Sequence, residues 1–70
     1  MALLISVAPA GEGWALKSDE LGENRVFESG GWAETAARDL ASRTAEAGRA
    51  AEVRIYIRGG ALAGVLRYPA

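Results

Sequence analysis

The chain has 70 residues, half of them apolar and 24% charged, and it contains no cysteine and no histidine. The composition is that of a folded globular domain, and the length allows a single domain, residues 1–70, with a small core. The absence of cysteine and histidine excludes disulfide bonds, nearly all transition-metal sites and the usual nucleophile–base pairs of enzymes. The net charge of −1 gives no overall field that would draw the protein to nucleic acid or to anionic lipid. Self-association is expected to supplement so small a core.

Residues 2–8 are almost all apolar, with Leu3, Ile5 and Val7 on one side of a predicted strand. No Lys or Arg precedes this run, and it falls far short of the roughly 20 apolar residues of a membrane span. We therefore interpret the run as a buried first strand and not as a signal peptide. We therefore expect no membrane partner, and the lack of cysteine agrees with a cytoplasmic protein.

A second strand is predicted at residues 13–18, where Trp14 and Leu16 alternate with smaller or charged residues. Residues 19–24 are rich in charge and contain Gly and Asn, which is typical of an exposed turn. A short third strand follows at residues 25–28. Trp14 is expected in the core.

The alanine-rich stretch that follows predicts a helix over residues 31–47. Ser29 is placed to cap its N-terminus, and Gly48 is placed to end it in a left-handed conformation. The side expected to face the sheet consists of small residues apart from one leucine: Ala33, Ala36, Ala37, Leu40, Ala41 and Thr44. Such a surface lets a helix lie close to a sheet, so the bulk of the core must come from the strands.

The last two strands are predicted at residues 52–58 and 62–68, joined by a two-residue loop of Gly59 and Gly60. Strict alternation along the first of them is the mark of a strand with one buried side. The residues expected to point at the helix are Val53, Ile55 and Ile57.

Together these elements predict an α+β fold: a two-layer sandwich in which one helix covers one face of an antiparallel sheet of four to five strands. The order along the chain is β-β-β-α-β-β. One helix covers only one side of a sheet, so the opposite face is expected to have no covering layer.

Three segments resemble a family of small bacterial proteins known as domain of unknown function 2188. They are "VAPAGEGWALKS" at 7–18, "VFESGGWAETAARDLA" at 26–41 and "AEVRIYIRGGALAGVLRYP" at 51–69. The resemblance covers nearly the whole chain and implies the same small α+β fold. It implies no activity, because the family has no assigned function.

The candidate functional surface is the uncovered face of the sheet. Arg54, Tyr56 and Arg58 are predicted to point away from the helix there, and Lys17 and Arg67 can join them from neighbouring strands. A basic surface with an aromatic residue is how sheet modules hold single-stranded nucleic acid. The alternatives are a solvated face with extended arginines and a surface for another protein or a second copy.

Trp32 at the start of the helix adds a second candidate contact. It is expected either to pack the helix onto the preceding loop, which we prefer, or to be exposed as an anchor for a partner. We expect no enzymatic activity and no cofactor. The leading prediction is a small domain that acts through protein contacts or as a homodimer, and the alternative is weak binding of nucleic acid through the open face.

Overall fold

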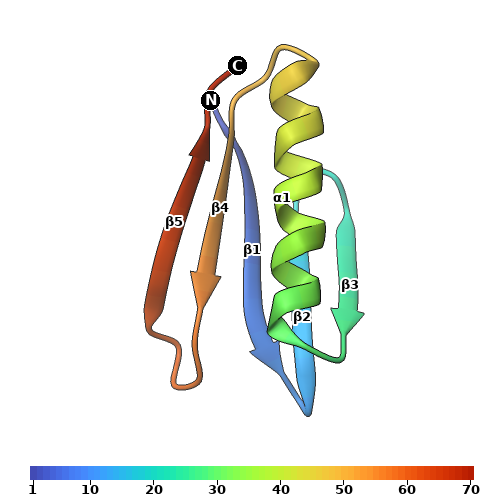
Figure 1. Cartoon of the computed structure of the whole chain (residues 1–70), viewed down its shortest axis with the longest axis vertical. Coiled ribbons are helices and arrows are strands. Elements are labelled where there is room, and N and C mark those ends of the chain that lie inside the picture. Colours follow the sequence, from blue (N-terminus) through green and yellow to red (C-terminus); the bar gives the residue numbers. More distant parts are fainter.

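The computed structural model describes all 70 residues. Five strands form one sheet, and a single helix lies against one of its faces (Figure 1). The elements in chain order are β1 (Leu3–Ala10), β2 (Gly13–Ser18), β3 (Glu23–Phe27), α1 (Gly30–Glu46), β4 (Ala51–Tyr56) and β5 (Leu62–Tyr68). The predicted α+β sandwich and its element order are confirmed.

The strands lie in the order β3-β2-β1-β4-β5 across the sheet. Three of the four neighbouring pairs are antiparallel, as predicted, but β1 and β4 are parallel, so the sheet is mixed. The cause is the connection through α1, which carries the chain from the edge strand β3 back across the sheet. A crossover of this kind places the next strand parallel to the one before it, and β3 already runs in the direction of β1.

The predicted capping residues at both ends of the helix are confirmed, although α1 begins and ends one residue earlier than the predicted 31–47. The Ser29 side chain accepts a hydrogen bond of 3.2 Å from the backbone N–H of Trp32, as expected of a capping residue. At the other end Gly48 has a φ of 98°. The backbone N–H groups of Gly48 and Arg49 donate to the carbonyl oxygens of Ala45 and Thr44, which satisfies groups left free by the end of the helix.

The core lies between α1 and the three central strands. Nine buried residues form it: Leu3, Ile5, Val7, Leu16, Ala33, Ala37, Ala41, Ala51 and Val53. The helix contributes only alanine to this set, so its backbone lies close to the sheet and the strands supply the large side chains, as predicted. Trp14, Phe27 and Leu40 pack around the set and are partly buried.

The predicted bounds of β4 and the predicted inward position of Ile57 are wrong. β4 ends at Tyr56, and Ile57 lies in the loop with its side chain 48% exposed. The loop has five residues, 57–61, and not the predicted two: the N–H of Gly60 donates to the Ile57 carbonyl, and the N–H of Ile57 donates to the Ala61 carbonyl. Gly59 and Gly60 both take positive φ values in this turn. A bulge in β5, opposite the Ile55–Tyr56 segment of β4, also shifts the pairing of these two strands by one residue just before the loop.

Two other strands are longer than predicted. β1 continues through Pro9 to Ala10, because pairing with β2 extends to Ala10 and Gly13 while pairing with β4 stops at Val7. Pro9 therefore needs no N–H for a neighbour on the β4 side. β3 begins at Glu23, two residues early, because the turn before it is tight enough for Gly22 to donate to the Asp19 carbonyl.

The helix is not long and apolar enough to cross a membrane.

Gly13 provides a direct test of the packing between β2 and β3. A Cβ atom at this position would overlap the carbonyl oxygen of Phe27, whereas one at Gly31 would have no heavy atom within 4 Å. We expect Gly13→Ala to lower the free energy of unfolding by about 1–3 kcal/mol. Gly31→Ala is the matched control and should raise it by up to about 1 kcal/mol through helix propensity. Urea unfolding measures both, and equal stability of Gly13→Ala and wild type would contradict this packing.

Candidate functional site

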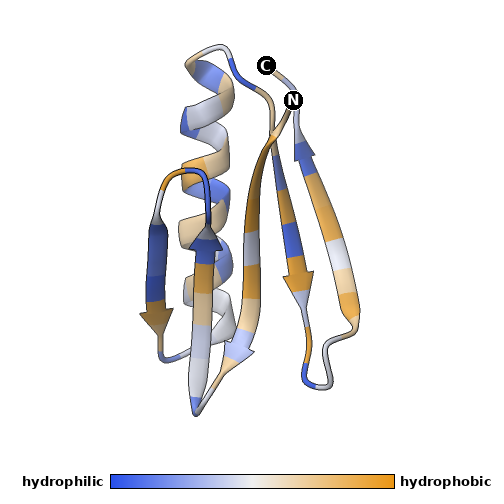
Figure 2. Cartoon of the chain, turned by 180° about the vertical axis from the view of Figure 1, so that it is seen from behind, coloured by the Kyte–Doolittle hydropathy of each residue, from blue (hydrophilic) through white to orange (hydrophobic).

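The face of the sheet opposite α1 is the candidate interaction surface, which we call the open face (Figure 2). It is built from side chains that alternate with the core residues along each strand. They are Leu4, Ser6 and Ala8 of β1, Ala15 and Lys17 of β2, Asn24 and Val26 of β3, Glu52, Arg54 and Tyr56 of β4, and Leu62, Val65 and Arg67 of β5.

The strand registers align part of the open face into an apolar row that crosses all five strands. Val26, Ala15 and Ala8 are paired across β3, β2 and β1, and Tyr56 and Leu62 are paired across β4 and β5. Ala8 and Tyr56 join the two parts because each follows directly after the last β1–β4 pair, Val7 and Ile55. The central alanines are small and at least half covered, but the ends of the row are open, with Val26 71% and Leu62 51% exposed. We call this set the apolar row. The exposed apolar surface of the row therefore lies at its two ends, on β3 and β5.

The next row along the strands is polar. Asn24, Lys17, Ser6 and Arg54 lie side by side from β3 to β4. Both cations of this row point to solvent, and Tyr56 stands next to Arg54 in the apolar row. This is the arrangement that resembles a nucleic-acid surface most closely, because a ring and two cations share one face.

Glu52 neutralises much of the remaining positive charge. One of its carboxylate oxygens lies 2.6 Å from Nε of Arg54, and the other lies 3.4 Å from Nε of Arg67. The Glu52 side chain is only 17% exposed, while the two arginines extend into solvent. The pKa of Arg54 is raised above its ordinary value, mainly by the hydrogen bond to Glu52 and to a smaller extent by the neighbouring Tyr56. Two of the face's three cations therefore share one carboxylate.

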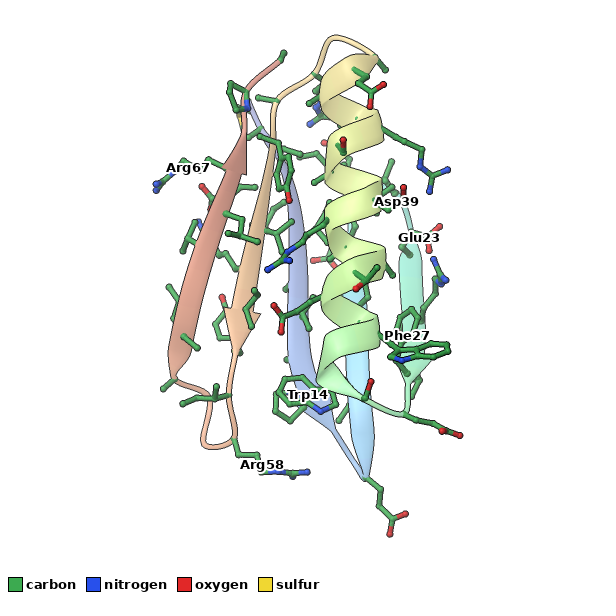
Figure 3. The ribbon with its side chains drawn as sticks, viewed as in Figure 1. Trp14, Glu23, Phe27, Asp39, Arg58 and Arg67 are labelled. Atoms are coloured by element: carbon green, nitrogen blue, oxygen red, sulfur yellow. The ribbon has the colours of Figure 1, made fainter.

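The structure brings together four of the six predicted surface residues. Lys17, Arg54, Tyr56 and Arg67 lie on the open face. Arg58 does not, because β4 ends before it, and it stands at the loop end of the β4–β5 hairpin while Arg67 stands near the other end (Figure 3). Its predicted place on the sheet face is therefore wrong.

Trp32 lies away from the open face, in the first turn of α1, and is 76% exposed. The preferred prediction, that it packs the helix onto the preceding loop, is wrong. It borders a shallow hollow between β3 and α1 that is also lined by Phe27, Thr35, Ala36 and Asp39. The guanidinium of Arg25 lies 5.1 Å from the centre of the Phe27 ring and covers one side of this aromatic residue.

The sequence interpretation gave Glu52 no role on the open face and missed the apolar row. Glu52 could have been found, since it precedes Arg54 by two residues on a strand and must share its face. The row could not, because its members come from five strands and align only once the registers are known. No group of three or more acidic side chains is arranged to hold a metal ion.

Comparison with protein-family models, with curated proteins and with solved structures found no match. The resemblance to domain of unknown function 2188 stays a prediction.

A separate ion pair lies at the border of the open face. The Arg49 guanidinium, in the loop after α1, donates two hydrogen bonds to the carboxylate of Glu20 in the turn after β2, one of them 2.9 Å long. These hydrogen bonds lower the pKa of Glu20 below its ordinary value. Glu20 and Asp19 also line a small hollow with Lys17, so the neighbourhood of that lysine is acidic.

The Glu20–Arg49 pair predicts a dependence of stability on pH. A carboxyl group whose pKa is lowered on folding stabilises the fold above its unfolded pKa, about 4.3, and this contribution disappears as the pH falls through the folded value. The stability difference between wild type and Glu20→Gln should therefore be present at pH 7 and shrink below about pH 4.3. Thermal unfolding from pH 7 to pH 3 measures it. Glu28→Gln removes an exposed carboxylate outside any ion pair and is the control; a pH-independent difference for Glu20→Gln would contradict the assignment.

Proposed function

We propose that the protein is a non-catalytic domain that acts through protein contacts and associates with itself as a homodimer. The observation that carries the proposal is the uncovered sheet: one helix covers part of one face, and the other face presents the apolar row. The exposed ends of this row, Val26 and Leu62, are apolar side chains that another protein can cover. A chain with so small a core also gains stability when a second copy shields part of its sheet.

Because the chain is small, an interface of ordinary size would cover a large part of its surface. A stable interface removes about 800 Å² of accessible surface from each partner. This chain has 4500 Å² of accessible surface, so an interface of that size takes up close to a fifth of it. The uncovered surface is large enough for such an interface, because no other element covers the open face or the two edge strands.

The charged groups support a role without catalysis. The hydrogen bonds between Glu20 and Arg49 lower the pKa of Glu20 and raise that of Arg49. The hydrogen bond to Glu52 raises the pKa of Arg54. Each of these shifts favours the charged form of its group. General acid–base catalysis near neutrality requires the opposite, a group that exchanges its proton near the working pH.

Binding of single-stranded nucleic acid is the alternative, favoured by the polar row with Lys17, Arg54 and the adjacent Tyr56. It is the weaker proposal, because Glu52 engages two of the three cations and acidic residues lie beside the third. Phosphate binding draws its affinity from cations that are free to replace counterions.

We place the protein in the bacterial cytoplasm. The absence of cysteine and the resemblance to small bacterial proteins support this placement. The name of the resembled family adds no process or partner to the proposal.

Sedimentation velocity across micromolar to millimolar concentration tests self-association. We expect the weight-average mass to rise from that of one chain to that of two, because apolar and backbone contacts form by mass action. The dimer should persist when salt is raised to about 0.5 M, where contacts between exposed charges are screened. A single species with the mass of one chain up to millimolar concentration would contradict the proposal.

A further inference from the structure

We propose that two copies pair through their β5 edges, in antiparallel orientation, to form one continuous ten-stranded sheet. The inference rests on the self-association proposed above and specifies its interface. β5 is one of two edge strands, the other being β3. An edge strand has a row of free backbone N–H and C=O groups that can pair with another chain.

The hydrogen-bond pattern shows which groups of β5 are free. Leu3 donates its N–H to the carbonyl of Ala50, so the even-numbered residues around β4 direct their backbone groups toward β1. The odd-numbered residues of β4 therefore bond to β5, and their partners there are Gly64, Leu66 and Tyr68. The residues between these partners point their backbone groups outward. Val65 and Arg67 thus present free N–H and C=O groups at the edge.

The side chains of β5 make this edge easy to desolvate. Within the regular segment 64–68 the one charged residue is Arg67, whose Nε lies 3.4 Å from the carboxylate of Glu52 in the same chain. By contrast, β3 carries Glu23 and Arg25, and charged side chains are a common way to prevent edge pairing. The bulge in the first part of β5 leaves the regular segment 64–68 for pairing.

The position of α1 leaves β5 accessible. The helix lies over the central strands, and β5 stands clear of it at the side of the molecule (Figure 1). On the helix side of β5, Leu66 and Tyr68 reach the core but stay partly exposed. A neighbouring β5 would therefore meet no helix, and it would cover these two side chains.

If a two-fold axis passes between the Leu66 residues of the two copies, the free backbone groups of Val65 and Arg67 can all form hydrogen bonds within the regular segment 64–68. Closed two-fold symmetry requires the two identical edges to be antiparallel. In this register Val65 of each copy exchanges both backbone hydrogen bonds with Arg67 of the other, and the two Leu66 side chains meet. Tyr68 then lies across from Gly64, where an aromatic ring can cover the bare glycine backbone. Each Arg67 keeps its own Glu52, so no charge is buried.

Packing of two open faces against each other is the competing arrangement, and the charges disfavour it. It would bury Arg54, Glu52 and Lys17 in the interface. Removing ions from water costs several kcal/mol for each ion, and the gain from their mutual attraction often falls short of that cost. Edge pairing leaves these charges in water and satisfies backbone groups with hydrogen bonds worth about 0.5–1.5 kcal/mol each.

Two proline substitutions at equivalent edge positions test the interface. Val65→Pro removes an outward N–H of β5 without breaking a bond to β4, and Val26→Pro does the same at the β3 edge. We expect Val65→Pro to raise the dissociation constant of the dimer by more than about tenfold. We expect Val26→Pro to leave it unchanged, with circular dichroism showing that both variants keep the wild-type fold.

Amide hydrogen exchange by NMR gives a second readout on the wild-type protein, which holds if a proline variant fails to fold. Exchange at Val65 N–H should slow as concentration rises and the dimer forms, whereas exchange at Val26 N–H should not change. Fast exchange at Val65 in a sample shown to be dimeric would overturn the inference.

The remaining outcomes separate the two proposals. Ala8→Lys places a cation in the centre of the apolar row and should leave the dimer intact. If Ala8→Lys or Val26→Pro gives monomers while Val65→Pro stays dimeric, the protein still self-associates and the β5 interface is wrong. If the wild type is monomeric at millimolar concentration, the proposed self-association itself fails.

Discussion

The contact between the alanine side of α1 and the central strands determines the rest of the structure. Ala33, Ala37 and Ala41 are fully buried, and their small side chains let the helix lie close to Ile5 and Val53. One helix covers only part of the sheet, since a helix about 10 Å wide cannot shield five strands spaced about 4.8 Å apart. The fold therefore has a compact centre with two free edges and one bare face.

The distribution of charge on that bare face follows mainly from β4. Alternation places Glu52, Arg54 and Tyr56 on one side of the strand, and the pairing with β5 adds Arg67. One carboxylate then lies within ion-pair distance of two guanidinium groups, which lowers the effective positive charge. A surface that looks strongly basic in the sequence is locally balanced in the fold. The exposed apolar ends of the neighbouring row become the more distinctive feature, which is why protein contact is the better supported role.

Period-two and helical spacing were sufficient to predict the element order, the buried side of α1 and the outward side of β4. The cap residues Ser29 and Gly48 were also predictable, because capping depends on local backbone chemistry. The parallel pairing of β1 and β4 was not, since it depends on where the crossover returns the chain. The inward position predicted for Ile57 failed because a five-residue loop ended the strand early. The exposure of Trp32 depends on how much of the helix end the sheet leaves uncovered, which no local pattern reveals.

The central claim is that α1 covers one face of the sheet and leaves the other in solvent. Methyl NMR with a soluble paramagnetic agent tests it most directly, because the agent broadens signals from side chains that it can approach. At concentrations where the chain is monomeric, the methyl signals of Val26 and Leu4 should broaden strongly, and those of Ile5 and Val53 should not. Protection of Val26 and Leu4, or broadening of Ile5 and Val53, would contradict the account.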